Sequence, residues 1–334
     1  GNEARSESFA TYTAHFARER GYPQDVVPGL AERLADPLPV GSSAGLLRPV
    51  WCAKTGILGE PAVAVAIIDS HVAMPALGVV DSGSLMGALG TSAVFLLLDK
   101  TARPLPRGIE GTAYSAAIPD AWCYEAGQAS FGDLLAWFIN AFPRSGNVKD
   151  DFAYYDRAAA LRSPGAGNLL ALDWWNGCRV PFGDSTLSGL LVGMNMRTTA
   201  VDIYRALMES ICFGARTIVD LLASSGSPIE RVVLTGGLAQ KNDVLMQMLA
   251  DILGCALEIP RLTHPTAIGA AIHGAVAAGV VTDYSDGAGR FGATDYRIVE
   301  PTTGVFPIYD ERYRRYREMS DNSSVRNVMH ALNK

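Results

Sequence analysis

Residues 231–259 read RVVLTGGLAQKNDVLMQMLADILGCALEI, and this stretch decides the fold class. Its first five residues are rich in β-branched side chains, which is typical of a strand, and Gly236-Gly237 then turns the chain. The apolar residues between Asp243 and Leu253 follow helical spacing, and a second strand is expected at Cys255–Ile259. Because strands and helices alternate, the stretch predicts an α/β fold with parallel strands.

The segments on either side extend this pattern. Thr199 and Asp202 form a capping box in front of apolar residues that recur every three or four positions up to Leu222, so one long helix is expected. Residues 267–275 read AIGAAIHGA, and their small side chains predict a helix that packs closely against its neighbours. Both helices fit the α/β class.

Two apolar runs nearer the amino terminus predict further strands. Ala62–Ile68 is uninterrupted and rich in β-branched residues, as expected of a strand buried on both faces. Ser92–Leu98 is the second run, and it follows Gly90-Thr91. Asp69 is therefore expected at the carboxyl end of a strand, at the edge where α/β proteins usually bind ligands.

Composition restricts the classes of protein to consider. The chain has 334 residues, of which 49% are hydrophobic and 19% charged, enough for one large domain or two. A net charge of -6 argues against a nucleic-acid partner, because phosphate backbones are bound mainly through clustered Lys and Arg. The apolar runs are far shorter than the ~20 residues that cross a bilayer, so no membrane partner and a cytoplasmic location are expected.

Cysteines and a basic cluster have simple structural interpretations. The five cysteines lack metal-ligand spacing, so they predict reduced structural thiols and no metal site. Cys212 falls on the apolar face of the long helix, where a thiol behaves as a small hydrophobe. Four arginines between Arg312 and Arg317 alternate with Tyr313 and Tyr316, and we interpret them as a solvated helix face.

Several turns and strand ends carry candidate site residues, and each has a structural alternative. Gly236-Gly237 lets a ligand approach the backbone or only turns the chain, and Gly90-Thr91-Ser92 holds a phosphate or forms an ordinary β-turn. Asp69 is a general base or a cap. Glu125 is functional or merely solvated, and His71 is interpreted as a structural hydrogen-bonding residue.

Taken in order along the chain, these features resemble the FGGY carbohydrate kinases, over nearly the whole sequence. The resemblance rests on Asp69, Gly90-Thr91-Ser92, Glu125-Ala126-Gly127, the long helix, Gly236-Gly237 and Ala267–Ala271. The stretches that begin at Asp69, Ala171 and Ala271 resemble the ribulokinase branch. The family implies the actin/hexokinase-type (ribonuclease H-like) ATPase fold, with a mixed sheet flanked by helices. It also implies that residues 1–80 are the tail of an amino-terminal sugar-binding domain and residues 81–334 a carboxy-terminal ATP-binding domain.

The resemblance implies a role for each matching residue. Asp69 matches the catalytic base that contacts the sugar and removes a hydroxyl proton, and Glu125 presents a carboxylate to the sugar. The residues expected to bind ATP are Gly90 and Thr91 at the transferred phosphate, Gly127 beside the nucleotide, Gly236, Gly237 and Leu238 at the adenosine, and Lys241 and Asn242 near the adenine. Mg2+ is expected to shield the phosphates, and no side-chain ligand for it is predicted.

The implied reaction converts ATP and a 2-ketopentose, L-ribulose, to ADP and L-ribulose 5-phosphate, a step of arabinose catabolism. Two alternatives stay open. One is an FGGY kinase for xylulose, D-ribulose, glycerol or another polyol, and the other is a non-catalytic relative that binds a nucleotide or a sugar. The expected partners are the sugar and, as a further open alternative, a second copy of the chain.

The sequence departs from the family at its amino-terminal side. The opening strand with its Asp-x-Gly-Thr phosphate loop and most of the sugar pocket are not found, so the chain is expected to be a fragment that is inactive by itself. Asp81-Ser82-Gly83-Ser84 is similar to that loop but falls between the Asp69 and Gly90 motifs. We interpret that similarity as a coincidence.

Overall fold

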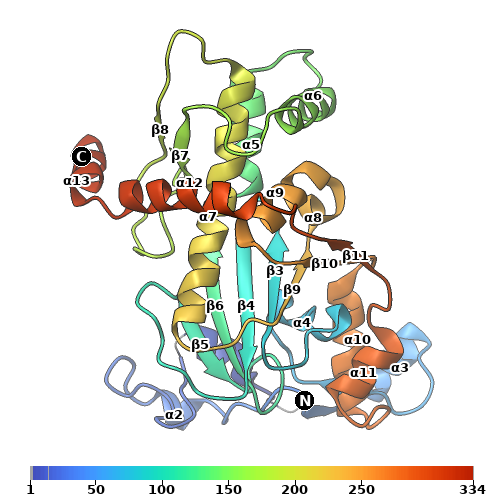
Figure 1. Ribbon diagram of the computed structural model, residues 1–334. Helices are drawn as coiled ribbons and strands as arrows, with labels where there is room; N and C mark the ends of the chain where they lie inside the picture. Colours follow the sequence, from blue (N-terminus) through green and yellow to red (C-terminus); the bar gives the residue numbers. More distant parts are fainter. Residues whose placement is uncertain (1–2, 14, 334) are drawn as a thin grey trace.

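A seven-stranded mixed sheet forms the centre of the computed structural model, which describes residues 3–13 and 15–333 (Figure 1). The strands, from one edge to the other, are β11 (Tyr296–Val299), β10 (Leu257–Pro260), β9 (Arg231–Thr235), β3 (Ser84–Leu89), β4 (Ala93–Asp99), β6 (Trp122–Gln128) and β5 (Gly111–Tyr114). β10, β9 and β3 run parallel, and the other neighbours are antiparallel. The predicted α/β class with a mixed sheet is confirmed.

Helices cover both faces of the sheet, because successive side chains of a strand point to opposite faces. On one face, Phe95 and Tyr124 belong to a large core with α5 (Gly132–Ala141), α6 (Val148–Ala160), α7 (Ala200–Ser224), α9 (Asp243–Leu253) and α12 (Phe306–Ser320). On the other face, Leu96 and Cys123 pack with η1 (Pro75–Leu77), α10 (Pro265–Ala277) and α11 (Tyr284–Phe291). Figure 1 shows α7 running along the sheet and α10 and α11 grouped beside it.

Shorter elements surround this centre. They are α1 (Glu7–Tyr12), α2 (Leu30–Arg33), β1 (Ser43–Leu46), α3 (Pro49–Thr55), β2 (Ala62–Ala64), α4 (Asp69–Val72), β7 (Leu170–Leu172), β8 (Leu190–Val192), α8 (Gly237–Lys241) and α13 (Ser323–Leu332). β1 pairs with β2, and β7 with β8, in two small antiparallel sheets. Among the described residues, no helix combines the length and apolarity needed to span a membrane.

Most predicted elements are confirmed. The side chain of Thr199 accepts a hydrogen bond from the backbone of Asp202 and completes the capping box of α7. α9 ends at Gly254, which adopts a left-handed conformation with φ of 70°. β10 begins at Leu257, two residues later than predicted.

The strand predicted at Ala62–Ile68 is wrong in both length and burial. Only its first three residues form β2, and Val63 is 40% exposed. The chain has left the strand before Asp69, which begins α4 instead of ending a strand. An apolar run indicates a tendency to be buried, but it does not say how many residues find a partner strand.

The basic cluster on α12 is only partly a solvated face. Tyr313 and Tyr316 belong to the core, whereas Arg314 and Arg315 are exposed. Arg312 turns inward and donates hydrogen bonds to other elements, so its interpretation as a solvated residue is wrong.

Candidate functional site

Three glycine positions predicted to bind ATP lie at one edge of the central sheet. β3 and β9 are parallel neighbours, so Gly90-Thr91 and Gly236-Gly237 leave the sheet at the same edge. β4 begins at this edge, and its pairing with β6 places Val94 opposite Gly127. Segments that are up to about 150 residues apart in the sequence are therefore brought together, as expected for an α/β ligand site.

The turn at Gly90-Thr91 is held by the start of α5. The backbone N–H of Gly132 donates to the carbonyl of Gly90 at 3.0 Å, and that of Asp133 donates to the carbonyl of Thr91 at 3.2 Å. Gly90 and Thr91 are both exposed. The N–H of Gly90 donates to the carbonyl of Ser92 at 3.0 Å, so the exposed Thr91 residue supplies the amide and the hydroxyl that are available to a ligand.

Gly132 joins the two glycine turns, and the sequence reasoning missed it. A Cβ atom at this position would lie 2.6 Å from the carbonyl oxygen of Gly90 and 2.8 Å from Cδ1 of Leu238. Only glycine permits so close an approach. The available signal was a glycine five residues after the predicted site residue Gly127.

Gly236 and Gly237 are glycines for different reasons. Gly236 has φ of +99°, and a Cβ there would lie 2.3 Å from the carbonyl oxygen of Leu89, so it allows β9 to turn against the end of β3. Gly237 begins α8, and a Cβ there would meet nothing within 4 Å. The space in front of Gly237 is open, whereas Gly236 is required by the protein's own packing.

The remaining residues of this motif differ in exposure. Leu238 is half-buried and Lys241 is exposed, whereas Asn242 is buried. The Oδ1 atom of Asn242 accepts from the backbone N–H of Leu245 at 2.9 Å and caps α9, and its Nδ2 atom donates to Asp156 at 3.2 Å. Asn242 thus has a structural role in addition to any role at the adenine.

Asp69 is exposed at the start of α4. Its Oδ1 atom accepts a hydrogen bond from the backbone N–H of Ser70 at 2.8 Å. α4 is fixed from behind, because α10 packs so closely that a Cβ at Gly269 would lie 1.8 Å from the carbonyl oxygen of Val72. The carboxylate therefore sits on a short, firmly held helix.

His71 and Glu125 lie next to each other on the same face of the sheet as α10. The Nε2 atom of His71 is 3.5 Å from Oε2 of Glu125, whose side chain is 22% exposed, whereas His71 is fully buried. Burial lowers the pKa of His71 to about 4, against a smaller opposing effect of Asp69, so the ring is neutral at neutral pH. Burial also raises the pKa of Glu125; Glu110 adds to this rise and Arg179 opposes it.

Gly127 makes room for an arginine that the sequence reasoning did not single out. A Cβ at Gly127 would lie 2.6 Å from Cζ of Arg179. Arg179 forms a bidentate ion pair with Glu110, with distances of 2.5 and 2.9 Å. Gly127 thus lies against Arg179, the charged residue that opposes the rise in the pKa of Glu125. The position of Gly127 beside the nucleotide stays a prediction.

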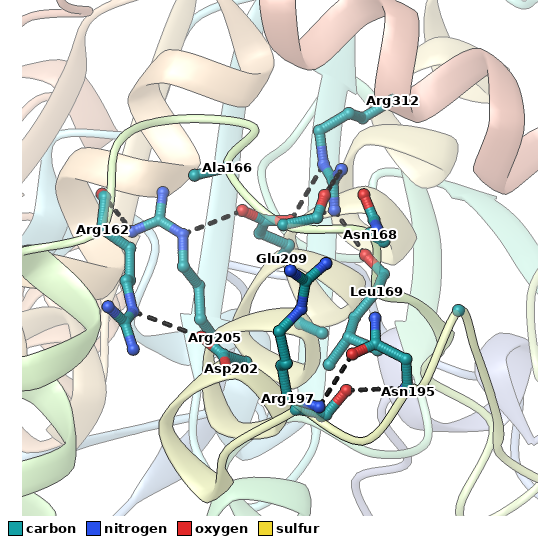
Figure 2. Close-up of a pocket in the computed structure, with 14 residues that line it drawn as sticks. Arg162, Ala166, Asn168, Leu169, Asn195, Arg197, Asp202, Arg205, Glu209 and Arg312 are labelled. Atoms are coloured by element: carbon teal, nitrogen blue, oxygen red, sulfur yellow. Dashed lines mark hydrogen bonds and ion pairs between the residues drawn. The ribbon is translucent and has the colours of Figure 1, made fainter.

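A separate polar cavity of about 210 Å³ lies between α7, α12 and two loops (Figure 2). Its buried residue Arg205 donates to Glu209, to Tyr309 and to the carbonyls of Ala159 and Arg162. Arg312 donates to the second carboxylate oxygen of Glu209 at 2.9 Å. None of the described residues lining this cavity is a predicted site residue, and most of the hydrogen-bonding capacity of Arg205 and Arg312 is used within the protein.

The described part of the chain contains no three-residue metal-ligating group and no disulfide. Within residues 3–13 and 15–333, no three His, Cys, Asp or Glu side chains are arranged to hold a metal ion. All five cysteines are free, and burial raises the pKa of Cys123 to about 12. The cysteines are therefore free thiols, and Cys123, Cys178 and Cys212 are buried.

Solved structures with the same fold are sugar kinases and related enzymes. The fold is similar to that of a xylulose kinase from Rhodospirillum rubrum, with a TM-score of 0.85 and 21% identity, over 99% of this chain and 66% of that one. It is also similar to glycerol kinase from Plasmodium falciparum, solved with ADP, with a TM-score of 0.80 and 17% identity, over 95% of this chain and 63% of that one. These likenesses show the actin/hexokinase-like fold.

Curated relatives are more similar in sequence. A ribulokinase from Bacillus licheniformis is 35% identical over 356 residues, which cover 100% of this chain and 64% of the relative. A ribulokinase from Mycolicibacterium smegmatis is 35% identical over 338 residues, which cover 96% of this chain and 60% of the relative. The chain thus spans somewhat less than two thirds of the length of these relatives.

The glycine turns and Glu125 all lie inside the part of the chain that matches a known family. Residues 85–278 match the FGGY family of carbohydrate kinases, C-terminal domain. This match covers more than half of the chain and includes β3, α7, β9 and α8. The chain therefore belongs to the FGGY family of carbohydrate kinases.

Proposed function

We propose that this chain is part of an ATP-dependent kinase that phosphorylates a 2-ketopentose, L-ribulose. The observation that carries the proposal is the meeting of Gly90-Thr91 and Gly236-Gly237 at one sheet edge, with open space in front of Gly237. Adjacent glycine turns expose backbone amides to which phosphate oxygens can bind. Membership of a carbohydrate kinase family supplies the class of reaction.

In this proposal the two turns bind opposite ends of ATP. Thr91 and Gly90 contact the phosphate that is transferred, and Gly237 with Leu238 accepts the adenosine. Lys241 and Asn242 lie toward the adenine, with Asn242 held in place by its bond to Asp156. Gly127 lies beside the nucleotide. Gly132 contributes by fixing the distance between the two turns.

Asp69 is the proposed general base, and Glu125 binds the sugar. Oδ2 of Asp69 takes the proton of the sugar's 5-hydroxyl while that oxygen forms a bond to the γ-phosphorus. The bond from the γ-phosphorus to the β,γ-bridging oxygen breaks, and ADP leaves with the bonding electrons. Reactions of this kind depend mainly on positioning and on stabilisation of charge.

Mg2+ would neutralise the phosphates during transfer. Magnesium usually keeps several water ligands and binds proteins through only one or two carboxylates together with substrate phosphates. No side chain is assigned to Mg2+, because Asp69 is the proposed base and Glu125 the proposed sugar ligand. A dedicated cage of side chains is not needed.

The curated relatives support the proposed sugar. Several proteins named ribulokinase are 34–35% identical to this chain, whereas the structures named xylulose kinase are about 20% identical and support the fold alone. Ribulose and xylulose differ at one stereocentre, so carboxylates such as Glu125 that bind hydroxyls are the groups expected to distinguish them.

The test is sugar-dependent release of ADP by the complete gene product, measured with L-ribulose, D-ribulose, xylulose and glycerol. L-Ribulose is expected to give the highest kcat/KM. A parallel assay of residues 1–334 alone is expected to show weak nucleotide binding and no turnover. ATP-dependent turnover with glycerol but with neither ribulose would overturn the sugar assignment, and absence of turnover with every sugar would overturn the kinase proposal.

A further inference from the structure

His71 is a buried titratable residue to which the proposed mechanism gives no task. Its side chain is fully buried, and its Nδ1 atom lies 3.1 Å from the hydroxyl oxygen of Ser70. Its Nε2 atom is buried without a hydrogen-bond partner among the described residues, 3.5 Å from Oε2 of Glu125. Buried ring nitrogens are normally paired, so this one calls for an explanation.

The neighbours of His71 select one tautomer. If the Ser70 hydroxyl donates to Nδ1, the ring proton is on Nε2 and faces the Glu125 carboxylate, which is favourable. If instead the proton were on Nδ1, the lone pair of Nε2 would face an anionic oxygen. The first arrangement is therefore expected while Glu125 is ionised.

The ring is also fixed in orientation. The ring of Tyr12 packs on it with the two centroids 4.5 Å apart. The Tyr12 hydroxyl donates to the carbonyl of Cys123 at 2.8 Å, two residues before Glu125 in β6. His71 is thus held between α1, α4 and β6, and the Nε2 atom remains directed at the carboxylate.

The gap between His71 and Glu125 is slightly too long for a hydrogen bond. N–H···O bonds have donor–acceptor distances of 2.7–3.2 Å, and the observed separation is 3.5 Å. Bonds at active sites are often long without substrate and shorten when it binds. A small rotation of the partly exposed Glu125 side chain would close the gap.

We infer that His71 is a positioning residue, which holds one oxygen of Glu125 through Nε2–H so that the other oxygen can bind a sugar hydroxyl. This inference rests on the proposed function, because it gives Glu125 the sugar as its ligand. His71 itself touches neither the sugar nor ATP. Its effect is on the geometry of the carboxylate.

The kinetic test compares His71→Leu with His71→Gln in the complete gene product. Leucine removes the donor, and loss of a hydrogen bond to a charged group is expected to raise KM for the sugar roughly 10- to 100-fold. KM for ATP is expected to stay the same. Glutamine carries an N–H donor and is expected to restore part of the sugar affinity. An unchanged sugar KM in folded His71→Leu, or equal rises in both KM values, would overturn the inference.

His273 offers a matched control. It is also buried, its Nδ1 atom lies 2.6 Å from the Tyr284 hydroxyl and its Nε2 atom lacks a described partner, but no carboxylate influences its pKa. His273→Gln perturbs a buried histidine in a similar way and is expected to leave the sugar KM unchanged. A rise equal to that of the His71 variants would show that general loss of packing, not positioning, is responsible.

A spectroscopic test does not depend on turnover. Long-range 1H–15N NMR spectra of the chain with labelled histidines report the tautomer of each ring, and His71 is expected to carry its proton on Nε2. A proton on Nδ1 would overturn the inference even in an active kinase. If His71 carries its proton on Nε2 but the protein turns over no sugar, the inferred interaction of His71 with the Glu125 carboxylate stands. That result would count against the proposed function alone.

Discussion

Two groups of polar side chains, one between α7 and α12 and one beside α4 and β6, differ in how completely they are paired. The arginine clamp consists of Arg205, Glu209 and Arg312, and both oxygens of Glu209 accept hydrogen bonds from arginine (Figure 2). The histidine group consists of Asp69, His71 and Glu125. Among the described residues the Nε2 atom of His71 has no hydrogen-bond partner, and the two carboxylates are partly or fully exposed.

This difference separates a structural role from a functional one. The clamp connects α7 and α12 and also binds carbonyls near the end of α6, so its hydrogen bonds are used to hold elements together. In the histidine group, the exposed carboxylates of Asp69 and Glu125 remain able to accept further hydrogen bonds. A stable fold alone does not require such groups. In this comparison, complete pairing accompanies a packing role, and the incomplete pairing beside Glu125 accompanies the proposed sugar-binding role.

The largest expected effect is on turnover. Asp69→Asn keeps the shape of the side chain but cannot accept the hydroxyl proton, so kcat of the complete gene product is expected to fall by roughly 10²–10⁴. Nucleotide affinity, measured by calorimetry, is expected to be unchanged. Near-normal kcat would remove Asp69 from the mechanism and would weaken the functional reading of the histidine group.

Breaking the arginine clamp should affect stability instead. Glu209→Ala leaves Arg205 and Arg312 without their carboxylate, and removal of one partner from a buried ion pair costs about 3–5 kcal/mol. Urea unfolding measures this loss. Arg197→Ala is the control, because Arg197 lines the same cavity but is exposed, and its effect is expected within about 0.5 kcal/mol. Equal losses in both variants would contradict the assigned role.

Acid should lower stability through His71. His71 has a pKa of about 4 when folded, so between pH 6.5 and 4 the unfolded chain binds the proton more readily. The free energy of unfolding is thus expected to fall as pH drops through this window, by up to about 3 kcal/mol from His71. Arginines stay charged throughout and contribute no such slope. His71→Gln should reduce the slope, and an unchanged slope would show that the ring is not buried as described.

The smallest expected effect is on nucleotide affinity. Gly237→Val places a branched side chain in the open space in front of α8, and ATP binding is expected to weaken about tenfold, or about 1.4 kcal/mol. The substitution meets no protein atom, so the fold should persist. Gly236→Ala is the contrasting variant, since its positive φ and contact with Leu89 predict a loss of stability. Unchanged ATP affinity of Gly237→Val would remove adenosine from this site.

The parts of the fold with strong local signals were predictable from the sequence. The capping box at Thr199 and the glycine at the end of α9 located their helices closely, because such signals act within a few residues. β2 was overestimated because strand length depends on a partner that the run itself does not specify. Arg312 was misread for the same reason, since its partner Glu209 is about 100 residues away.

The sequence offered candidate site residues but not the contacts between them. Gly90, Gly236 and Glu125 stood at strand ends or in a recognisable order. Contacts such as that of Arg179 over Gly127, or of His71 beside Glu125, join segments more than 50 residues apart, and no periodicity reports them. The need for glycine at position 132 depends on two turns that are far apart in the sequence, so it could not be predicted from either turn alone.

The position of Gly132 has a mechanical consequence. With the carbonyl of Gly90 and the side chain of Leu238 both packed against this one residue, the two turns cannot slide or separate without a steric clash or a gap. We therefore expect the two turns to move together as one rigid unit. Any opening and closing around ATP is then expected at a hinge outside these two turns.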